Sequence, residues 1–216
     1  MDQKQLIKII SHISKQKYRR ALNDIKKGGI TKDKFIRRAN ILTDLGLVHK
    51  EKRGRKKYYS TDLDEIQINY PATTKINTSS YSKLELILIR EDDIKYHHLN
   101  LNDIRWFIHM KVFGALREPK TNNELCKKVG LDNANGYRCI RNLIKLDLVN
   151  PELKSTNYAR KRKNISFYET TVKEFKINYT VGGKTKIHIK PENIDGVKEN
   201  IWYLLHGKSI TNLKFS

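Results

Sequence analysis

Lysine and arginine residues cluster in four short segments of this sequence, and clustered cations are suited to binding a polyanion. Two clusters lie in stretches whose apolar residues have helical spacing, and two lie at predicted turns between strands. Each phosphate that such a cation neutralises releases a counterion, which favours association with nucleic acid. The clusters fall within residues 32–38, 53–57, 138–141 and 160–163. Nucleic acid is therefore the first partner that these residue types indicate.

The net charge of the whole chain is also strongly positive, as the basic clusters suggest. The sequence has 44 Lys+Arg against 23 Asp+Glu, for a formal net charge of +21. Residues 1–66 carry +10, residues 67–104 carry −1 and residues 105–216 carry +12. Two basic segments are thus joined by a nearly neutral one. Because lysine is abundant throughout, the positions of the arginines carry more information than the net charge.

Residues suited to catalysis or to metal binding do not form a recognisable pattern. The histidines are scattered, and none has ligand spacing with a cysteine or a carboxylate. Cys126 and Cys139 are expected on adjacent helices as packing thiols, and the acidic residues 91–93 as a solvated turn. The sequence has no phosphate-binding glycine loop, dinucleotide fingerprint or nucleophilic serine motif. We therefore expect no enzyme, no catalytic or metal-binding residues and no cofactor.

Membrane and secreted classes are disfavoured as well. Uninterrupted apolar runs, such as residues 86–89, are far shorter than the about 20 residues of a membrane span. The first residues lack the apolar segment of a signal peptide. Two cysteines are too few for a disulfide scaffold. These features predict a protein of the cytoplasm, associated with the nucleoid, without a membrane partner.

Two blocks of sequence recur in the same order. Residues 59–70 (YSTDLDEIQINY) match residues 168–179 (YETTVKEFKINY), and residues 42–48 (LTDLGLV) match residues 143–149 (LIKLDLV). The offset between the two matches differs by eight residues, so the second copy is longer between its blocks. This self-similarity predicts a duplicated structural unit.

Each copy is expected to form three helices followed by a β-hairpin. In the first copy the predicted elements are a helix at 3–15, a helix ending at Gly28, a helix between Thr31 and Gly46, and strands at 47–52 and 57–61. In the second they are helices at 103–117, after the Thr121–Glu124 capping box and at 133–146, then a longer hairpin whose tip is 154–163. Outside the copies we expect a strand at 84–89, a hairpin at 174–190, a helix at 191–206 and a strand at 209–215.

Both copies resemble winged helix-turn-helix domains, a pattern found in many bacterial and archaeal transcription regulators. Residues 35–61 and 124–149 carry the resemblance most clearly. It implies a mainly α fold with small β-hairpins, within the α+β class. The implied domains are winged helices at 1–66 and 103–172, a linker with a β-strand at 67–102, and an appendage of hairpin, helix and strand at 173–216.

The resemblance also implies roles for the clustered residues. The second helix of such a motif places its N-terminal part in the major groove, where arginine pairs with guanine and asparagine with adenine. The wing lies along the backbone or enters a minor groove. The implied recognition residues are Lys32, Lys34, Arg37 and Arg38, then Asn133, Asn135, Tyr137, Arg138 and Arg141. The implied wing residues are Arg53, Arg55, Lys56 and Lys57, then Lys154, Arg160, Lys161, Arg162 and Lys163.

These roles imply sequence-specific binding of double-stranded DNA, most simply by a transcription regulator. The chain would act as a homodimer or as a single-chain pseudo-dimer, alongside the transcription or replication machinery. One alternative is a plasmid or viral replication initiator, since such initiators also resemble two linked winged helices; tandem repeats at an origin would identify it. A second is a winged-helix module that binds protein within a transcription assembly, which absent DNA affinity would favour. RNA binding is a third, although exposed aromatics for stacking are few.

Overall fold

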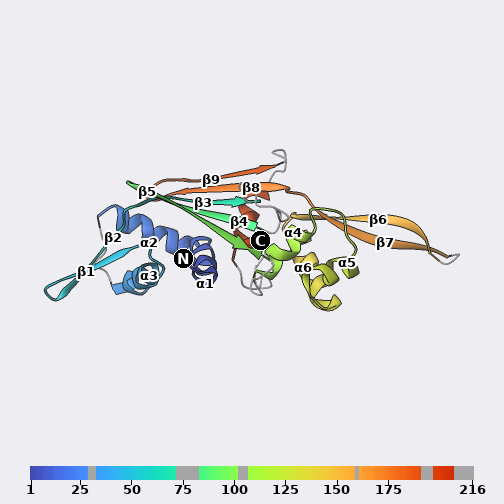
Figure 1. The fold of residues 1–216 in the computed structure, drawn as a ribbon, viewed down its shortest axis with the longest axis horizontal. Helices are drawn as coiled ribbons and strands as arrows, with labels where there is room; N and C mark the ends of the chain where they lie inside the picture. The colour runs from blue at the N-terminus through green and yellow to red at the C-terminus, as the bar shows by residue number, and fades with distance from the viewer. Residues whose placement is uncertain (29–32, 72–82, 102–106, 159–160, 191–196, 207–216) are drawn as a thin grey trace. The chain divides into compact units, whose positions relative to one another are not determined.

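The computed structural model describes residues 1–28, 33–71, 83–101, 107–158, 161–190 and 197–206, without the side chains of 33–34, 154–158, 161–164 and 199 (Figure 1). The described residues form seven helices and nine strands. In chain order they are α1 (Gln3–Ile13), α2 (Gln16–Lys26), α3 (Asp33–Asp44), β1 (His49–Arg53), β2 (Lys56–Ser60), β3 (Leu63–Tyr70), β4 (Lys83–Arg90), β5 (Asp93–Asn100), α4 (Ile108–Ala115), α5 (Asn122–Val129), α6 (Asn133–Lys145), β6 (Val149–Tyr158), β7 (Lys161–Thr170), β8 (Glu174–Thr180), β9 (Thr185–Lys190) and α7 (Val197–Leu204).

The chain divides into two compact units, each built from segments that are not contiguous in sequence. The first contains Met1–Asn69, Glu85–Leu99 and Lys176–Ile187. The second contains Tyr70–Leu84, Asn100–Phe175 and His188–Ser216. Each unit has three helices followed by a two-stranded hairpin, β1–β2 in the first and β6–β7 in the second. The order of elements expected for each copy is therefore confirmed.

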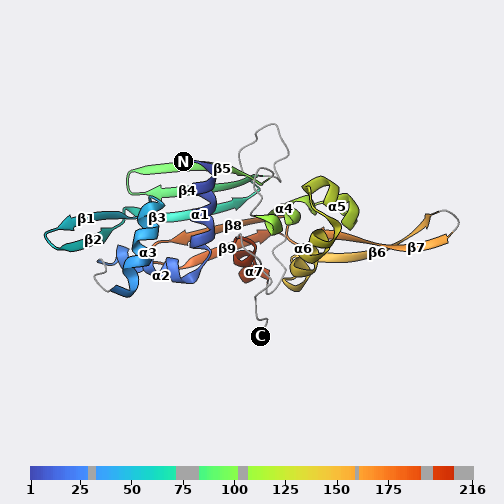
Figure 2. The same ribbon diagram turned by 90° about the horizontal axis from the view of Figure 1, so that it is seen from below.

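A five-stranded antiparallel sheet with the order β5-β4-β3-β8-β9 contradicts the expected fold class (Figure 2). The prediction of a mainly α fold with small β-hairpins was wrong, because the fold is α+β with a substantial sheet. The strand at 84–89 and the hairpin at 174–190 were predicted, but β3 and β5 were not. In β3 a bulge between Leu63 and Glu65 interrupts the alternation of apolar residues. The pairing of β3 with β8 joins residues over a hundred positions apart, which no local pattern reports.

The repeated sequence blocks adopt matching structures. Both LTDLGLV and LIKLDLV end a helix with a left-handed residue, Gly46 at φ 70° and Asp147 at φ 54°. In each, the next leucine donates its N–H at 3.0 Å to the carbonyl of the leucine five residues earlier. This bond closes the helix terminus and turns the chain into the hairpin. The duplication predicted from sequence is thus visible in the backbone.

The second pair of blocks supplies the two central strands of the sheet, β3 and β8. Their final tyrosines, Tyr70 and Tyr179, are both 2% exposed. The Tyr179 hydroxyl donates a hydrogen bond to the backbone carbonyl of Arg19 in α2, at 2.9 Å. The Tyr70 ring stacks on Phe175 with the centroids 5.4 Å apart. The apolar side chains of α1 are buried, and α1 crosses one face of the sheet (Figure 2).

Most predicted helices match the structure, but α4 begins at Ile108 rather than at the predicted residue 103, and residues 103–106 lie outside the described residues. The capping box at Thr121 and Glu124 is present, and α7 falls within the helix expected at 191–206. The predicted strand at 209–215 lies outside the described residues. In the part of the chain that the structure describes, no helix combines the length and the apolar character needed to cross a bilayer.

Candidate nucleic-acid interface

The helix α6 is fixed at its N-terminus by a tight turn and a side-chain cap. Gly130 adopts a left-handed conformation, φ 69°, which ends α5. Asp132 then accepts a hydrogen bond from the backbone N–H of Asn135 at 2.8 Å, and this bond holds the pKa of its carboxyl below the usual range. The cap determines where α6 begins, and therefore which side chains it presents outward.

The helices α5 and α6 cross closely at a glycine. A Cβ on Gly136 would lie 2.2 Å from Cys126 Sγ and 2.9 Å from Asn122 Oδ1. The Asn122 amide donates to the carbonyl of Asn133 at 3.1 Å, which links the two helices directly. Cys139 packs on the inner face of α6, and burial raises the pKa of its thiol to about 11. Cys126 and Cys139 are both free, buried thiols.

Gly136→Ala should lower the free energy of unfolding by about 1 kcal/mol or more. Overpacking against Cys126 and Asn122 outweighs the higher helix propensity of alanine. Urea unfolding followed by circular dichroism would measure the change. The double variant Gly136→Ala/Cys126→Ala is the control, because removal of Sγ should restore part of the lost stability. Full stability of Gly136→Ala alone would contradict the close crossing.

The outer face of α6 carries five of the predicted residues, and all are exposed: Asn133, Asn135, Tyr137, Arg138 and Arg141. The Arg141 guanidinium carbon lies 5.4 Å from the centroid of the Tyr137 ring, a cation–π contact that restricts both side chains. The Asn135 amide instead donates to Asp132 at 2.5 Å, within the cap. The structure thus brings Tyr137, Arg138 and Arg141 together and commits Asn135 to the helix terminus.

The corresponding helix of the first unit, α3, presents fewer of its predicted residues. Arg37 is exposed, and the Arg38 guanidinium lies 5.6 Å from the ring of Phe35. Lys34 lies in α3, but its side chain is outside the described part, and Lys32 lies outside the described residues altogether. Of the four residues predicted on this helix, the structure therefore describes the side chains of Arg37 and Arg38.

Asn40 of α3 anchors the hairpin β1–β2, a role that the sequence did not indicate. Its Oδ1 accepts hydrogen bonds from Lys50 Nζ and from the Tyr59 hydroxyl, both at 3.0 Å. Tyr59 is buried, whereas its neighbour Tyr58 is exposed. Sequence spacing placed Asn40 on the outer face of its helix. Only the fold of the hairpin shows that its amide faces inward.

The hairpin β1–β2 carries the predicted basic tip. Arg53 pairs with Lys56 across the turn, and Gly54 adopts φ 60°. Arg53 also forms an ion pair with Glu51 at 2.8 Å, and this contact lowers the pKa of the Glu51 carboxyl. Arg55, Lys56 and Lys57 are exposed, and none of them forms an ion pair with another residue that the structure describes. This tip thus concentrates positive charge at the end of a short, anchored ribbon.

The hairpin β6–β7 is longer than predicted. Its strands pair without a break from Val149↔Thr170 to Tyr158↔Lys161. The expected tip at 154–163 was therefore too wide, because Lys154 pairs with Ile165 inside the ladder. Lys161, Arg162 and Lys163 lie in β7, although their side chains are not described, and Arg160 is outside the described residues.

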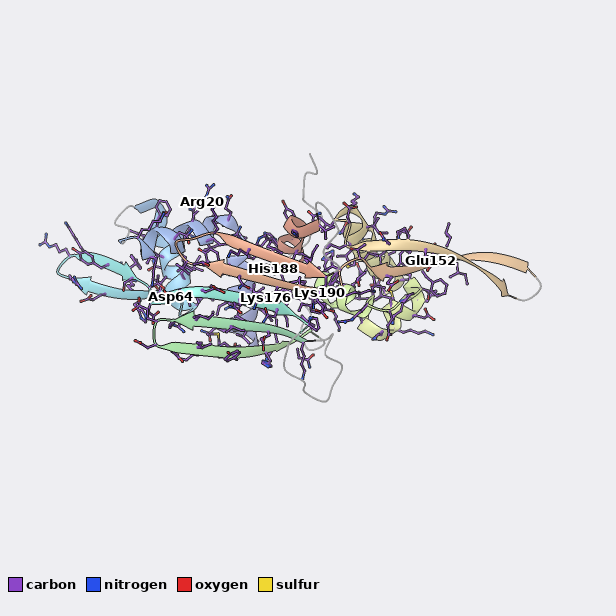
Figure 3. All side chains as sticks on the ribbon, turned by 90° about the horizontal axis from the view of Figure 1, so that it is seen from above. Arg20, Asp64, Glu152, Lys176, His188 and Lys190 are labelled. Carbon is purple, nitrogen blue, oxygen red and sulfur yellow. The ribbon has the colours of Figure 1, made fainter. Side chains whose placement is uncertain are left out.

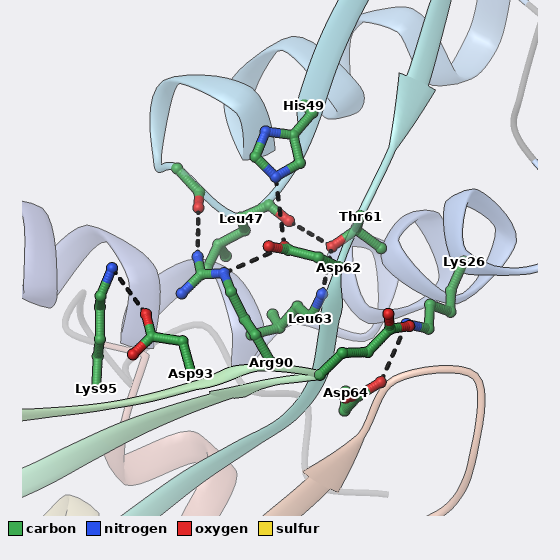
Figure 4. Close-up of polar contacts among 12 residues, drawn as sticks. Lys26, Leu47, His49, Thr61, Asp62, Leu63, Asp64, Arg90, Asp93 and Lys95 are labelled. Carbon is green, nitrogen blue, oxygen red and sulfur yellow. Dashed lines mark hydrogen bonds and ion pairs between the residues drawn. The ribbon is translucent and has the colours of Figure 1, made fainter.

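A polar cluster joins the end of α3 to the sheet and to the start of β1 (Figure 4). The Arg90 guanidinium donates to Asp62 Oδ1 at 3.1 Å and to the carbonyl of Gly46 at 3.0 Å. His49 Nε2 lies 3.4 Å from the same Asp62 oxygen. Burial is the largest single influence and acts to raise the pKa of Asp62, but the charge and hydrogen bond of Arg90, a backbone hydrogen bond and the nearby His49 together leave that pKa lowered. The cluster positions α3 and its hairpin through residues distant in sequence, which carried no motif.

Comparison of the chain with protein-family models, with curated proteins and with solved structures found no match in any of the three.

Proposed function

We propose that this chain binds double-stranded DNA in a sequence-specific manner, most simply as a transcription regulator built on two winged helices. In this proposal α3 and α6 are recognition helices, and β1–β2 and β6–β7 are wings. The protein is a binding protein rather than an enzyme, and it acts on the nucleoid in the cytoplasm. The exposed cluster of Tyr137, Arg138 and Arg141 on α6 is the observation that carries the proposal.

The size and chemistry of α6 support entry into a major groove. Thirteen residues form a rod of about 20 Å, and the groove, about 12 Å wide, admits one helix. Arg138 and Arg141 can each donate two parallel hydrogen bonds to the O6 and N7 acceptors of guanine. Tyr137 limits the rotamers of Arg141 before binding, so less conformational entropy is lost on contact. Asn133, at the start of the helix, offers an amide that suits adenine.

The proposal is tested by Arg138→Ala and Arg141→Ala. The preferred duplex is first selected from random sequences, and its affinity for each variant is then measured. Each substitution should cost about 1–3 kcal/mol and relax the preference at particular base pairs. Arg20→Ala is the matched control, since it removes one exposed cation from α2 (Figure 3). Equal affinity of all three variants and the parent chain would overturn the proposal.

A further inference from the structure

The two edges of the five-stranded sheet differ in the side chains that they expose. The edge strand β9 carries exposed Lys186, His188 and Lys190, and Figure 3 labels the last two. Lysines on an edge oppose pairing with another strand. The other edge strand, β5, exposes Ile94 by 53% and Tyr96 by 61%. Natural sheets rarely leave a strand of this kind without a partner.

The backbone of β5 is available along its outer side. Among the described strands, β5 is paired only with β4. The carbonyl of His98 accepts a hydrogen bond from the Gln3 side chain at 2.9 Å, so it faces away from β4. Backbone groups alternate in direction along a strand, so those of Ile94 and Tyr96 face the same outer side. Both residues therefore present donors and acceptors to an incoming strand.

The charges that flank Ile94 are self-complementary. Asp93 and Lys95 form an ion pair at 2.9 Å within the strand, so both side chains lie over the same face. If a second copy of β5 approaches antiparallel with Ile94 opposite Ile94, each Asp93 lies opposite Lys95 of the other copy. Tyr96 then lies diagonally across from the second Ile94, within reach of an aromatic ring. A two-fold axis generates every one of these contacts twice.

We infer that β5 is a self-association surface, through which two copies of this chain pair edge to edge about a two-fold axis. Residues 93–95 of the two copies then pair across the axis, and the cluster of Ile94 and Tyr96 is covered in part. The partner of β5 is a second copy of the chain, because the charges of Asp93 and Lys95 are complementary to those of another β5 strand. The lysines of β9 oppose the alternative, in which β5 of one copy pairs with β9 of the next to form an open chain of copies. The inference does not depend on DNA binding.

The test is sedimentation equilibrium of the full chain without DNA, over a range of concentrations. The parent chain should dimerise. Lys95→Asp places Asp93 opposite an aspartate twice and should raise the dimer dissociation constant about tenfold or more. Asp93→Lys should do the same. The double variant Asp93→Lys/Lys95→Asp restores both opposite-charge pairs and should recover dimerisation.

Lys186→Asp on β9 is the matched control and should leave the dissociation constant unchanged. Circular dichroism of each variant verifies that it is folded. A parent chain that is monomeric at every concentration overturns the inference. So does a dimer that Lys95→Asp leaves intact, or one that the double variant fails to restore.

Discussion

Replacing Arg53, Arg55, Lys56 and Lys57 together with glutamine should weaken DNA binding by about a thousandfold at 0.1 M salt. Each phosphate contact contributes about 0.9 to the slope of log K against log salt concentration, so losing four flattens that slope by about 3.6. The loss should be similar for all duplex sequences, because phosphates carry no sequence information. Affinity measured across a salt series on two unrelated duplexes would give both quantities.

The control variant must lose the same number of positive charges from a different surface of the protein. Lys176, Lys184, Lys186 and Lys190 are exposed on or beside β8 and β9, and their replacement with glutamine leaves the same net charge as the hairpin variant. Only a weak general effect is expected from this control. If both variants lost affinity equally, the hairpin would act through total charge alone, and its assignment as a wing would be refuted.

The free energy of unfolding should fall by about 3 kcal/mol through His109 as the pH drops from 7 to 4. His109 is 9% exposed, and burial lowers the pKa of its imidazole to about 4 from the ordinary 6.5. Between these values the unfolded chain binds a proton that the folded chain does not. Stability from this group is therefore complete above pH 6.5 and is lost as the pH falls toward 4.

Urea unfolding at a series of pH values would measure this loss. Carboxylates also titrate at the acid end of the range, so the informative quantity is the difference between the parent chain and His109→Gln. Glutamine retains an acceptor for Asn142, whose amide lies 3.3 Å from His109 Nε2. The variant should have a shallower pH dependence of its stability than the parent chain. Parallel curves for His109→Gln and the parent would contradict the prediction.

Local features of the fold could be predicted from the sequence, because their causes lie within one turn of chain. The capping box at Thr121 predicted where α5 begins, and the spacing of apolar residues predicted α6 at 133–146, from which its exposed face followed. The hairpin tip at 53–57 was equally local. Spacing of apolar residues predicted each helix for the same reason.

Features that depend on distant pairing could not be predicted. β3 was missed because the bulge between Leu63 and Glu65 interrupts its apolar alternation, and its partner β8 lies over a hundred residues away. Asn40 has the spacing of an outward-facing residue, and only the packing of Tyr59 shows that it anchors the hairpin. Arg90 and Asp62 are separated by 28 positions, and neither belongs to a motif. Side-chain roles of this kind depend on tertiary contacts that a periodicity does not encode.

Because the first unit includes Lys176–Ile187, its sheet cannot be completed while the ribosome is still translating the second copy. The N-terminal helices and hairpin emerge early, but the neighbour of β3 is synthesised more than a hundred residues later. Until then β3 has an unpaired edge, which is a site for wrong pairing with other chains. Neither duplicated copy therefore completes its fold from its own residues alone. The duplicated halves complete their folding jointly, late in synthesis.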